Sequence, residues 1–283
     1  MTEFFKMHGL GNDFVVLDAR QQTGSLSPQL AAALADRHTG IGCDQIMVLR
    51  PPATSGDLFL EMINADGSPA GACGNGTRCV ADLLMAETGR DQIAIETVSG
   101  LLTAWRAGDQ ISVDMGSPRF GWQDIPLSRK MDTGAVPLAA APVPAVCVSM
   151  GNPHAVLFVD DAEAVNIAEL GPQLEQDPLF PERANIEFAH IIAADRIRMR
   201  VWERGAGITR ACGSGACATA VAAVRAGLAG RQVELVLDGG VLGLEWTAGD
   251  RVIMTGPSEL VSRGHLEGGL AARYAVEGPG DGR

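Results

Sequence analysis

The sequence predicts an α+β protein of two homologous domains, each a curled mixed or antiparallel sheet around a central helix, related by a pseudo-twofold axis. Three observations lead to this fold class: an internal repeat, short apolar runs bounded by turn residues, and one largely apolar helical segment in each half. The repeat offset is about 140 residues, a normal domain size. Its matching segments are Gly11-Asn12 with Gly151-Asn152, Gln45-Ile46 with Asn185-Ile186, Ala72–Gly76 with Ala211–Gly215, and Trp105–Asp109 with Trp246–Asp250. Several matches in one order at nearly constant spacing indicate a duplicated domain.

The strands of the first half are expected where short apolar runs end at Gly, Pro, Asn or Asp. A hairpin turn is expected between the last two runs, at Ala107–Asp109. The predicted strands are Phe14–Leu17, Gln45–Leu49, Leu58–Ile63, Ile93–Thr97, Leu101–Trp105 and Ile111–Met115.

Helices are expected at three places. Ser27–Arg37 begins with a Ser that can cap a helix and a Pro at the first helical position. Gly76–Glu87 and its repeat, Gly215–Ala226, consist mostly of Ala, Leu, Met, Val and Thr. Because a helix that is apolar on all sides is a buried helix, these two are predicted to be the central helices of the two domains.

The domain boundaries follow from the repeat. Residues 1–118 form the predicted first domain and residues 119–261 the second. The stretch from Pro118 to Val146 contains five prolines and is the expected crossing between them.

Composition excludes several classes of protein. The net charge is −12 and no stretch gathers basic residues, so nucleic acid and anionic membranes are not expected partners. No segment approaches the roughly 18 apolar residues of a membrane span, and the N-terminus lacks the apolar core of a secretory signal. Six cysteines are too few for a disulfide scaffold in a chain of 283 residues. The expected location is therefore the cytoplasm, with the cysteines reduced.

Two cysteine segments carry the predicted chemistry. Cys73 and Cys212 each stand in an Ala-Cys-Gly-(Asn/Ser)-Gly segment that opens onto a predicted central helix. The glycines leave backbone N–H groups uncovered for an anion, and a helix N-terminus is expected to lower the pKa of a thiol. Taken singly, each cysteine is better interpreted as a small buried hydrophobic residue. As a pair related by the repeat, they favour a reaction that needs two proton-transferring groups.

A metal site is not predicted. Five residues separate Cys73 from Cys79 and four separate Cys212 from Cys217, whereas zinc sites use tighter pairs. The four remaining cysteines are assigned to the core: Cys43, Cys79, Cys147 and Cys217.

The motifs together resemble the diaminopimelate epimerase family, from residue 7 to about residue 256. The segments that carry the resemblance are Met7–Phe14, Gly42–Gln45, Asn64–Ser68, Cys73–Gly76, Gly151–His154, Trp202–Gly205 and Ala211–Cys217. Membership implies an isomerase that needs no cofactor and interconverts LL- and meso-2,6-diaminopimelate, on the route to lysine and peptidoglycan precursors. It also implies a homodimer and a last strand, at about residues 262–276, that joins the first domain.

The resemblance also implies roles for individual residues. Cys73 and Cys212 are the catalytic acid and base, because inverting a stereocentre needs a base on one face and an acid on the other. His154 and Glu203, which replace Phe14 and Asn64 of the first half, are expected to adjust the pKa values of the thiols. The predicted substrate-binding residues are Asn12, Gln45, Asn64, Gly74, Asn75, Asn152, Asn185, Glu203, Arg204, Gly213 and Ser214. Arg204 is the expected partner of the distal carboxylate, since a guanidinium offers two parallel donors.

Three positions depart from the family pattern: Pro69, Ala72 and Ile208. None is a predicted catalytic residue, so the departures concern loops rather than the reaction. Two other functions remain open at this stage. One is a proline or hydroxyproline racemase of the same fold, and the other is a non-catalytic thiol redox switch.

Overall fold

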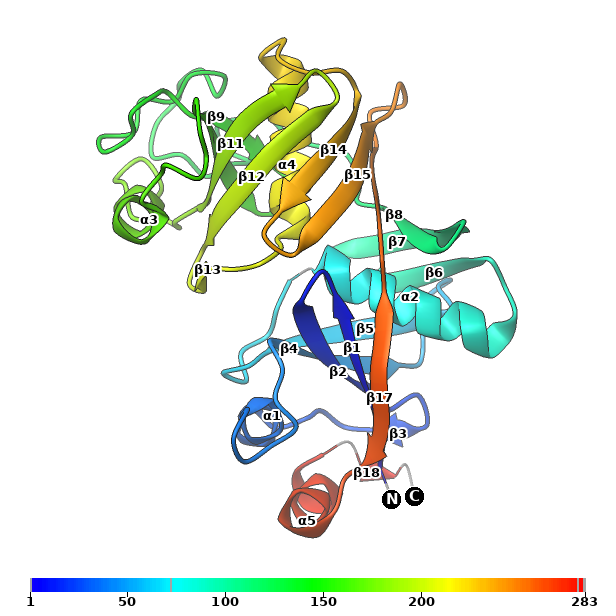
Figure 1. Cartoon of the computed structure of the whole chain (residues 1–283). Helices are drawn as coiled ribbons and strands as arrows, with labels where there is room; N and C mark the ends of the chain where they lie inside the picture. The colour runs from blue at the N-terminus through cyan, green and yellow to red at the C-terminus, as the bar shows by residue number, and fades with distance from the viewer. Residues whose placement is uncertain (1, 72, 279, 282–283) are drawn as a thin grey trace. The chain divides into compact units, whose positions relative to one another are not determined.

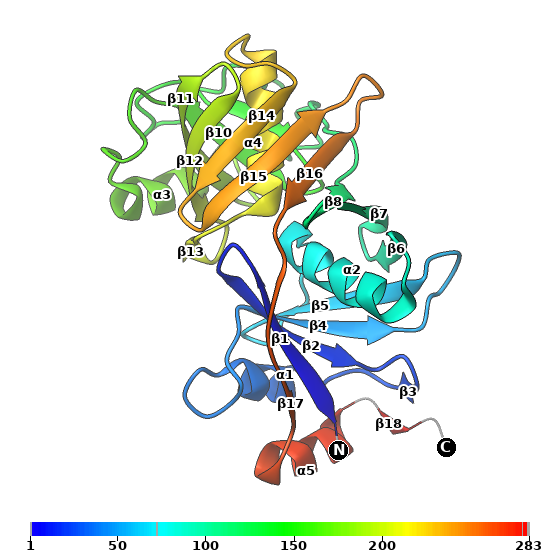
Figure 2. The same ribbon diagram turned by 45° about the vertical axis from the view of Figure 1, so that its right-hand side comes forward.

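The computed structural model describes residues 2–71, 73–278 and 280–281, which leaves Ala72 outside the described residues. The chain forms two units (Figures 1 and 2). The first contains the described residues up to Val113 and from Pro257 onward, and the second is Asp114–Gly256. Sequence analysis placed the boundaries after residues 118 and 261.

The first unit is a mixed sheet with the strand order β17-β1-β2-β4-β5-β6-β7-β8. The short strands β3 (Gln22–Thr23) and β18 (Gly280–Asp281) pair separately. The strands of the sheet are β1 (Glu3–Gly9), β2 (Asn12–Asp18), β4 (Gln45–Arg50), β5 (Leu58–Asn64), β6 (Gln92–Thr97), β7 (Gly100–Ala107), β8 (Gln110–Asp114) and β17 (Glu259–His265).

The second unit is a mixed sheet with the strand order β16-β15-β14-β12-β11-β10-β9, and the short β13 pairs with β12. Its strands are β9 (Val146–Ser149), β10 (Pro153–Phe158), β11 (Asn185–Ala193), β12 (Arg196–Glu203), β13 (Gly207–Ile208), β14 (Gln232–Leu237), β15 (Gly240–Trp246) and β16 (Val252–Gly256).

The two units share one topology, which confirms the duplication. In each unit an antiparallel pair is followed by a parallel partner, an antiparallel strand, a long helix, and a strand that returns in parallel. The register repeats as well. Phe14 pairs with Gln45 in the first unit, and His154 pairs with Asn185 in the second.

Each sheet curls around a central helix, as predicted. Helix α2 (Gly74–Thr88) contacts β1 and β2 as well as β6 and β7, and α4 (Gly213–Arg225) contacts strands from β9 to β16. The helix is amphipathic in neither case, since buried side chains surround most of its length. Figure 2 shows α2 lying against the strands of its own unit.

The first unit has a second apolar layer on the other face of its sheet. Helices α1 (Pro28–Ala35) and α5 (Gly268–Glu277) pack there, over a cluster that includes Val15, Leu17 and Ile46. Met47, the next residue along β4, lies instead against Gly76 of α2. Because successive side chains of a strand point to opposite faces, β4 is buried on both, which explains its unbroken apolar sequence.

The structure corrects two expectations that were drawn from the sequence. The proline-rich stretch after Pro118 is no bare crossing, since Ile125 and Val136 belong to the core of the second unit and Arg119 pairs with Ser149. The final strand ends at His265, and residues 268–277 form α5. Leu270 and Tyr274, four residues apart, face the same cluster, and this spacing suits a helix.

Sequence analysis also missed elements whose signals were weak. Strand β1 contains Lys6 and His8, which interrupt its apolar pattern. Helix α3 (Ile167–Glu175) contains Pro172 and lacks a side-chain cap. The predicted hairpin at Ala107–Asp109 is confirmed, since Ala107 pairs with Gln110 and Gly108 has a φ of 65°.

Candidate active site

The two predicted catalytic cysteines occupy equivalent places in the two units. Cys73 is the N-cap of α2 and Cys212 is the N-cap of α4, and both have extended backbone angles. The Cys73 sulfur accepts a hydrogen bond from Gly76 N at 3.4 Å. Each thiol therefore lies at the positive end of a buried helix, beside the uncovered N–H groups of its first turn.

The glycines of these loops make room for side chains from the sheets. A Cβ on Gly76 would lie 2.3 Å from the Met47 methyl group. A Cβ on Gly215, the matching residue, would lie 2.7 Å from Glu187 Oε1 and 3.3 Å from Cys212 Sγ. A strand side chain thus reaches the first helical turn in both units, and a Cβ at either glycine would force that side chain to move.

In the first unit, amide side chains surround Cys73. Asn12 Oδ1 accepts from the Cys73 thiol at 3.7 Å and from Asn75 Nδ2 at 3.3 Å. Asn75 is 1% exposed. A second amide pair lies nearby in the sheet, where Gln45 Nε2 donates to Asn64 Oδ1 at 3.0 Å. These predicted binding residues are neutral.

An ion-pair network that sequence analysis missed holds Asn12 in place. Asp44 Oδ2 accepts from Asn12 Nδ2 at 3.0 Å, and Arg37 bridges Asp44 and Asp13 with contacts of 2.7 Å. Lys6 Nζ lies 2.5 Å from Asp13 Oδ2. Burial opposes ionisation of Asp13, but the hydrogen bonds from Arg37 and Lys6 outweigh it and keep its pKa well below the usual range. In the sequence, the signal for this network was the adjacent pair Asn12-Asp13 in the segment Met7–Phe14.

Arg78 is a second residue that sequence analysis missed. It is fully buried on α2, where it donates to Asn75 Oδ1 at 3.0 Å. Its position one repeat later is Cys217, so the repeat offered a signal. Arg78 orients the amide that in turn contacts Asn12.

In the second unit, four polar side chains form a chain of successive contacts that ends at the Cys212 sulfur. His154 Nδ1 lies 2.7 Å from Glu187 Oε1, and its Nε2 lies 3.1 Å from Asn152 Oδ1. Asn152 Nδ2 donates to Ser214 Oγ at 3.3 Å. Ser214 Oγ is 3.7 Å from Cys212 Sγ. His154 and Glu187 are both 0% exposed.

Glu187 was not among the predicted site residues. The signal was present, because an acid stands alone in the buried run Ile186–Ala189 of β11. Buried acids are rare unless paired, and Glu187 pairs with His154.

The electrostatics around Cys212 correct one expectation. Burial raises the pKa of the Cys212 thiol well above its ordinary value, and the carboxylates of Glu203 and Glu187 raise it further. The predicted lowering by the helix N-terminus is therefore wrong for this thiol, since desolvation outweighs the helix dipole. Burial likewise raises the pKa of Glu203, which accepts from the Thr209 hydroxyl.

Arg204 lies at the turn that follows β12. Its backbone N–H donates to Asn185 Oδ1 at 2.9 Å, and Asn185 Nδ2 donates to Pro153 O at 3.0 Å. The exposed guanidinium contacts only a backbone carbonyl, at 3.2 Å from Glu182 O, among the described residues. Glu175, a buried acid of α3, accepts from the next N–H of the turn, Gly205, at 2.9 Å. The turn is thus fixed while the Arg204 side chain stays available to an anion.

The predicted site residues therefore gather in two groups, one within each unit. Gly74 and Gly213 are the first helical residues after the cysteines. The departures from the family pattern lie apart from the thiols: Pro69 forms a bridge with Ile63, and Ile208 is an exposed residue of β13 that pairs with Trp202.

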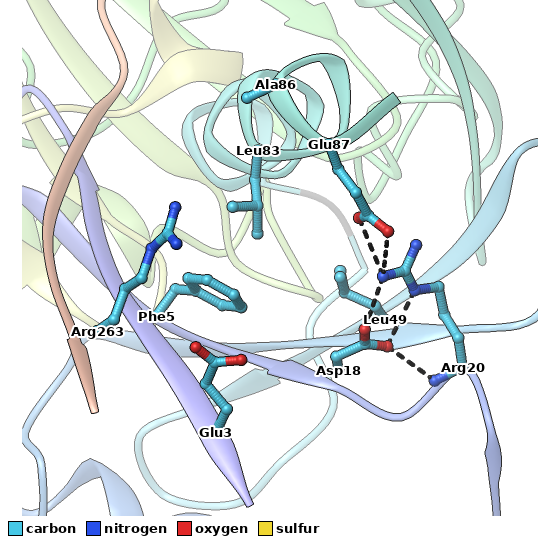
Figure 3. Close-up of a pocket in the computed structure, with 9 residues that line it drawn as sticks. All are labelled: Glu3, Phe5, Asp18, Arg20, Leu49, Leu83, Ala86, Glu87 and Arg263. Atoms are coloured by element: carbon cyan, nitrogen blue, oxygen red, sulfur yellow. Dashed lines mark hydrogen bonds and ion pairs between the residues drawn. The ribbon is translucent and has the colours of Figure 1, made fainter. Parts of the chain in front are cut away.

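A separate cavity of about 340 Å³ lies in the first unit, between α2 and the strands (Figure 3). Leu49 and Leu83 line it, and Arg20 joins Asp18 to Glu87 by ion pairs at its rim. It contains none of the predicted site residues. In the part of the chain that the structure describes, no three His, Cys, Asp or Glu side chains are placed to hold a metal ion. No helix among the described residues is long and apolar enough to cross a membrane.

The fold defines a class that includes epimerases and racemases. A predicted epimerase from Pseudomonas aeruginosa has a TM-score of 0.69 at 19% identity, with 95% of this chain and 100% of that chain covered. A probable proline racemase from Agrobacterium radiobacter has a TM-score of 0.67 at 16% identity, with 100% and 99% covered. At these identities the likeness concerns the fold alone.

Sequence comparison identifies the family within that class. The family model described as diaminopimelate epimerase matches residues 4–121 and 146–261. Diaminopimelate epimerase of Rhodospirillum centenum is 58% identical over 94% of this chain and 92% of its own length. That of Acidiphilium cryptum is 55% identical over 95% and 98%. The chain belongs to the diaminopimelate epimerase family and is an isomerase.

Proposed function

We propose that this protein interconverts LL- and meso-2,6-diaminopimelate without a cofactor, with Cys73 and Cys212 as the two proton-transferring groups. The observation that carries the proposal is the equivalence of the two thiols. Each caps the buried central helix of a unit, and the two units share one topology. The high identity to named diaminopimelate epimerases supports the substrate.

The helix N-termini supply the stabilisation that the reaction needs. Removal of the α-hydrogen of an amino acid places a second negative charge beside the carboxylate. Backbone N–H groups at the starts of α2 and α4 are preorganised donors for that charge. Gly74, Asn75, Gly213 and Ser214 are the residues of these first turns, and we assign them to the reacting end of the substrate.

Cys212 holds its proton tightly. Since burial and two carboxylates raise the pKa of Cys212, this thiol stays protonated in the resting enzyme at neutral pH. We infer that Cys212 is the acid and Cys73 the base in the direction that starts from this state. The reverse direction uses the opposite protonation, and we assign His154 and Glu203 to adjusting the pKa of Cys212.

The distal end of the substrate carries a second ammonium and carboxylate. The amides of Asn64, Asn152 and Asn185 can accept from the ammonium, and the exposed Arg204 guanidinium can bind the carboxylate in a bidentate manner. The amides are neutral, so the Arg204 guanidinium is the charged group that we assign to the carboxylate. We propose that the enzyme acts as a cytoplasmic homodimer in the synthesis of lysine and of peptidoglycan precursors.

The deciding experiment is an assay on LL-diaminopimelate in deuterated water without added cofactor. Thiol protons exchange with solvent, so meso product should contain deuterium at the inverted carbon. L-Proline and trans-4-hydroxy-L-proline in parallel incubations should remain unchanged. Racemisation of proline, or meso product that keeps its original hydrogen, would contradict the proposal.

A further inference from the structure

The repeat breaks its symmetry at one fully buried pair of side chains. In the first unit these positions are Phe14 and Met47, and in the second they are His154 and Glu187. The Phe and Met are apolar, whereas His154 Nδ1 and Glu187 Oε1 lie 2.7 Å apart with 0% of either side chain exposed, a pair that is ionic when the ring is protonated. A buried ion pair is often no more stable than the apolar pair that it replaces. A pair retained at such a position points to a role other than stability.

Glu187 lies between the histidine and the start of α4. Its Oε1 is 2.7 Å from His154 Nδ1, and a Cβ on Gly215 would touch the same oxygen at 2.7 Å. Its Oε2 is buried and has no hydrogen-bond partner among the described residues. The imidazole is therefore the strongest partner of this carboxylate.

The contact with Glu187 determines what the other ring nitrogen offers. A carboxylate oxygen at Nδ1 requires a proton there, so Nε2 either donates as part of an imidazolium or accepts as part of a neutral ring. Nε2 faces the side-chain amide of Asn152, which can present either its oxygen or its NH₂ group. The Asn152 amide also contacts Ser214, and Ser214 contacts Cys212.

Only two directions of hydrogen bonding along this chain are self-consistent. When the ring is an imidazolium, it donates to Asn152 Oδ1, Asn152 donates to Ser214, and the Ser214 hydroxyl donates to the Cys212 sulfur. When the ring is neutral, Asn152 donates to Nε2, Ser214 donates to Asn152, and the Cys212 thiol donates to Ser214. The two directions contain the same number of protons. The first suits a thiolate at Cys212 and the second a thiol.

We propose that Glu187 is a positioning residue that controls the ionisation of Cys212 through His154, Asn152 and Ser214. As the counter-ion of the imidazolium, it favours the direction in which donors point at the sulfur. The consequence of Glu187 for catalysis rests on the proposed function, but the effect of Glu187 on the Cys212 thiol does not.

The direct effects of nearby charges on the Cys212 thiol run the other way. Glu203 and Glu187 each repel a thiolate at Cys212 directly. Burial raises the pKa of the Cys147 thiol on β9, Glu187 raises it further, and Arg225 at the end of α4 lowers it. The contact of Glu187 with the imidazole is a direct one of 2.7 Å, whereas a Cβ on Gly215 would lie between the carboxylate and the sulfur. Because Coulomb energy falls with distance, the loss of the imidazolium partner should outweigh the loss of repulsion.

The test is the Glu187→Gln variant, which keeps an acceptor for Nδ1–H but has no charge. The rate of alkylation of Cys212 by iodoacetamide, followed by peptide mass spectrometry, should rise with pH along a curve displaced about one pH unit to the alkaline side. At pH 7, kcat/KM should fall about tenfold to a hundredfold, with the loss in kcat rather than KM. The activity should recover at higher pH.

Three further variants make the result specific. Glu187→Asp retains the charge and should restore part of the alkylation curve, even if the Gln variant folds poorly. Ser214→Ala breaks the chain, so Glu187→Gln should add little further shift in the double variant. Glu96→Gln removes another buried acid, in the first unit, and should leave the alkylation curve unchanged.

Curves for Glu187→Gln that coincide with those of the unaltered protein, or that move to the acid side, would overturn the proposal. A Glu187→Asp variant that differs from the unaltered protein no less than the Gln variant would do the same. If the unaltered protein fails to epimerise diaminopimelate, the proposed function is wrong, while the alkylation curves still decide the role of Glu187.

Discussion

Among single residues, Cys73 and Cys212 differ more than the repeat suggests. Both cap helices, but Cys73 contacts the neutral amide of Asn12, whereas Cys212 lies among Glu203, Glu187 and Ser214. Equivalent backbone positions therefore hold thiols with different surroundings. The proposed reaction needs one thiol ionised while the other is protonated, and different surroundings suit that requirement.

Replacing either catalytic thiol should stop the reaction in both directions. Cys73→Ala and Cys212→Ala should each lower kcat/KM by a thousandfold or more, about the upper part of the range for a lost acid or base. Cys79→Ala and Cys217→Ala are matched controls, since these thiols lie within the same helices and are fully buried. The controls should lose about 1 kcal/mol of stability and keep their activity. Full activity in either catalytic variant would contradict the two-thiol assignment.

At the scale of elements, buried polar side chains hold the loops that connect the strands. Glu96, at the end of β6, accepts from Ala53 N, Thr54 N and Gly56 N at distances of 2.7–2.9 Å. It thereby fixes the connection between β4 and β5. The hydrogen bonds, led by that from the Thr54 hydroxyl, lower the pKa of Glu96 to about 2.

This anchor should make the stability of the first unit depend on pH. A carboxyl whose pKa is lower in the folded state stabilises above its unfolded pKa and loses that contribution as pH falls through the folded value. We expect amide protection of residues 52–57, measured by hydrogen exchange, to weaken as the pH falls from about 4.5 toward 2. Glu96→Gln should show weak protection at all pH values. An identical pH dependence in the variant and the unaltered protein would exclude this role.

In the whole molecule, the chain returns to its first unit after completing the second. β17 pairs with β1, and α5 adds Tyr274 to the cluster under α1. Tyr274 is 4% exposed, and its hydroxyl donates to Gln22 Oε1 at 3.0 Å. The first unit is therefore closed by residues more than 250 positions away in sequence.

Tyr274→Ala should destabilise the first unit selectively. Loss of a buried aromatic ring costs about 3 kcal/mol, and hydrogen exchange should show reduced protection in residues 2–113 but not in residues 114–256. Val276→Ala on the same helix is the control, because Val276 is 85% exposed and should change little. Equal loss of protection in both units would show that they unfold as one body.

The sequence by itself determined the duplication, the central helices and the family, because a repeat, an apolar helix and contiguous motifs are local patterns that survive without coordinates. Cys73, Cys212, His154 and Glu203 were predicted as site residues in this way, and their roles stay predictions. Only the tertiary structure revealed the partners of those residues. Glu187 stands in an apolar strand and Arg78 in an apolar helix, and their roles depend on their partners in the packed chain, His154 on the neighbouring strand and Asn75 on the same helix. The tertiary structure also decided that the pKa of Cys212 is raised, since burial is a property of the packed chain and not of the motif.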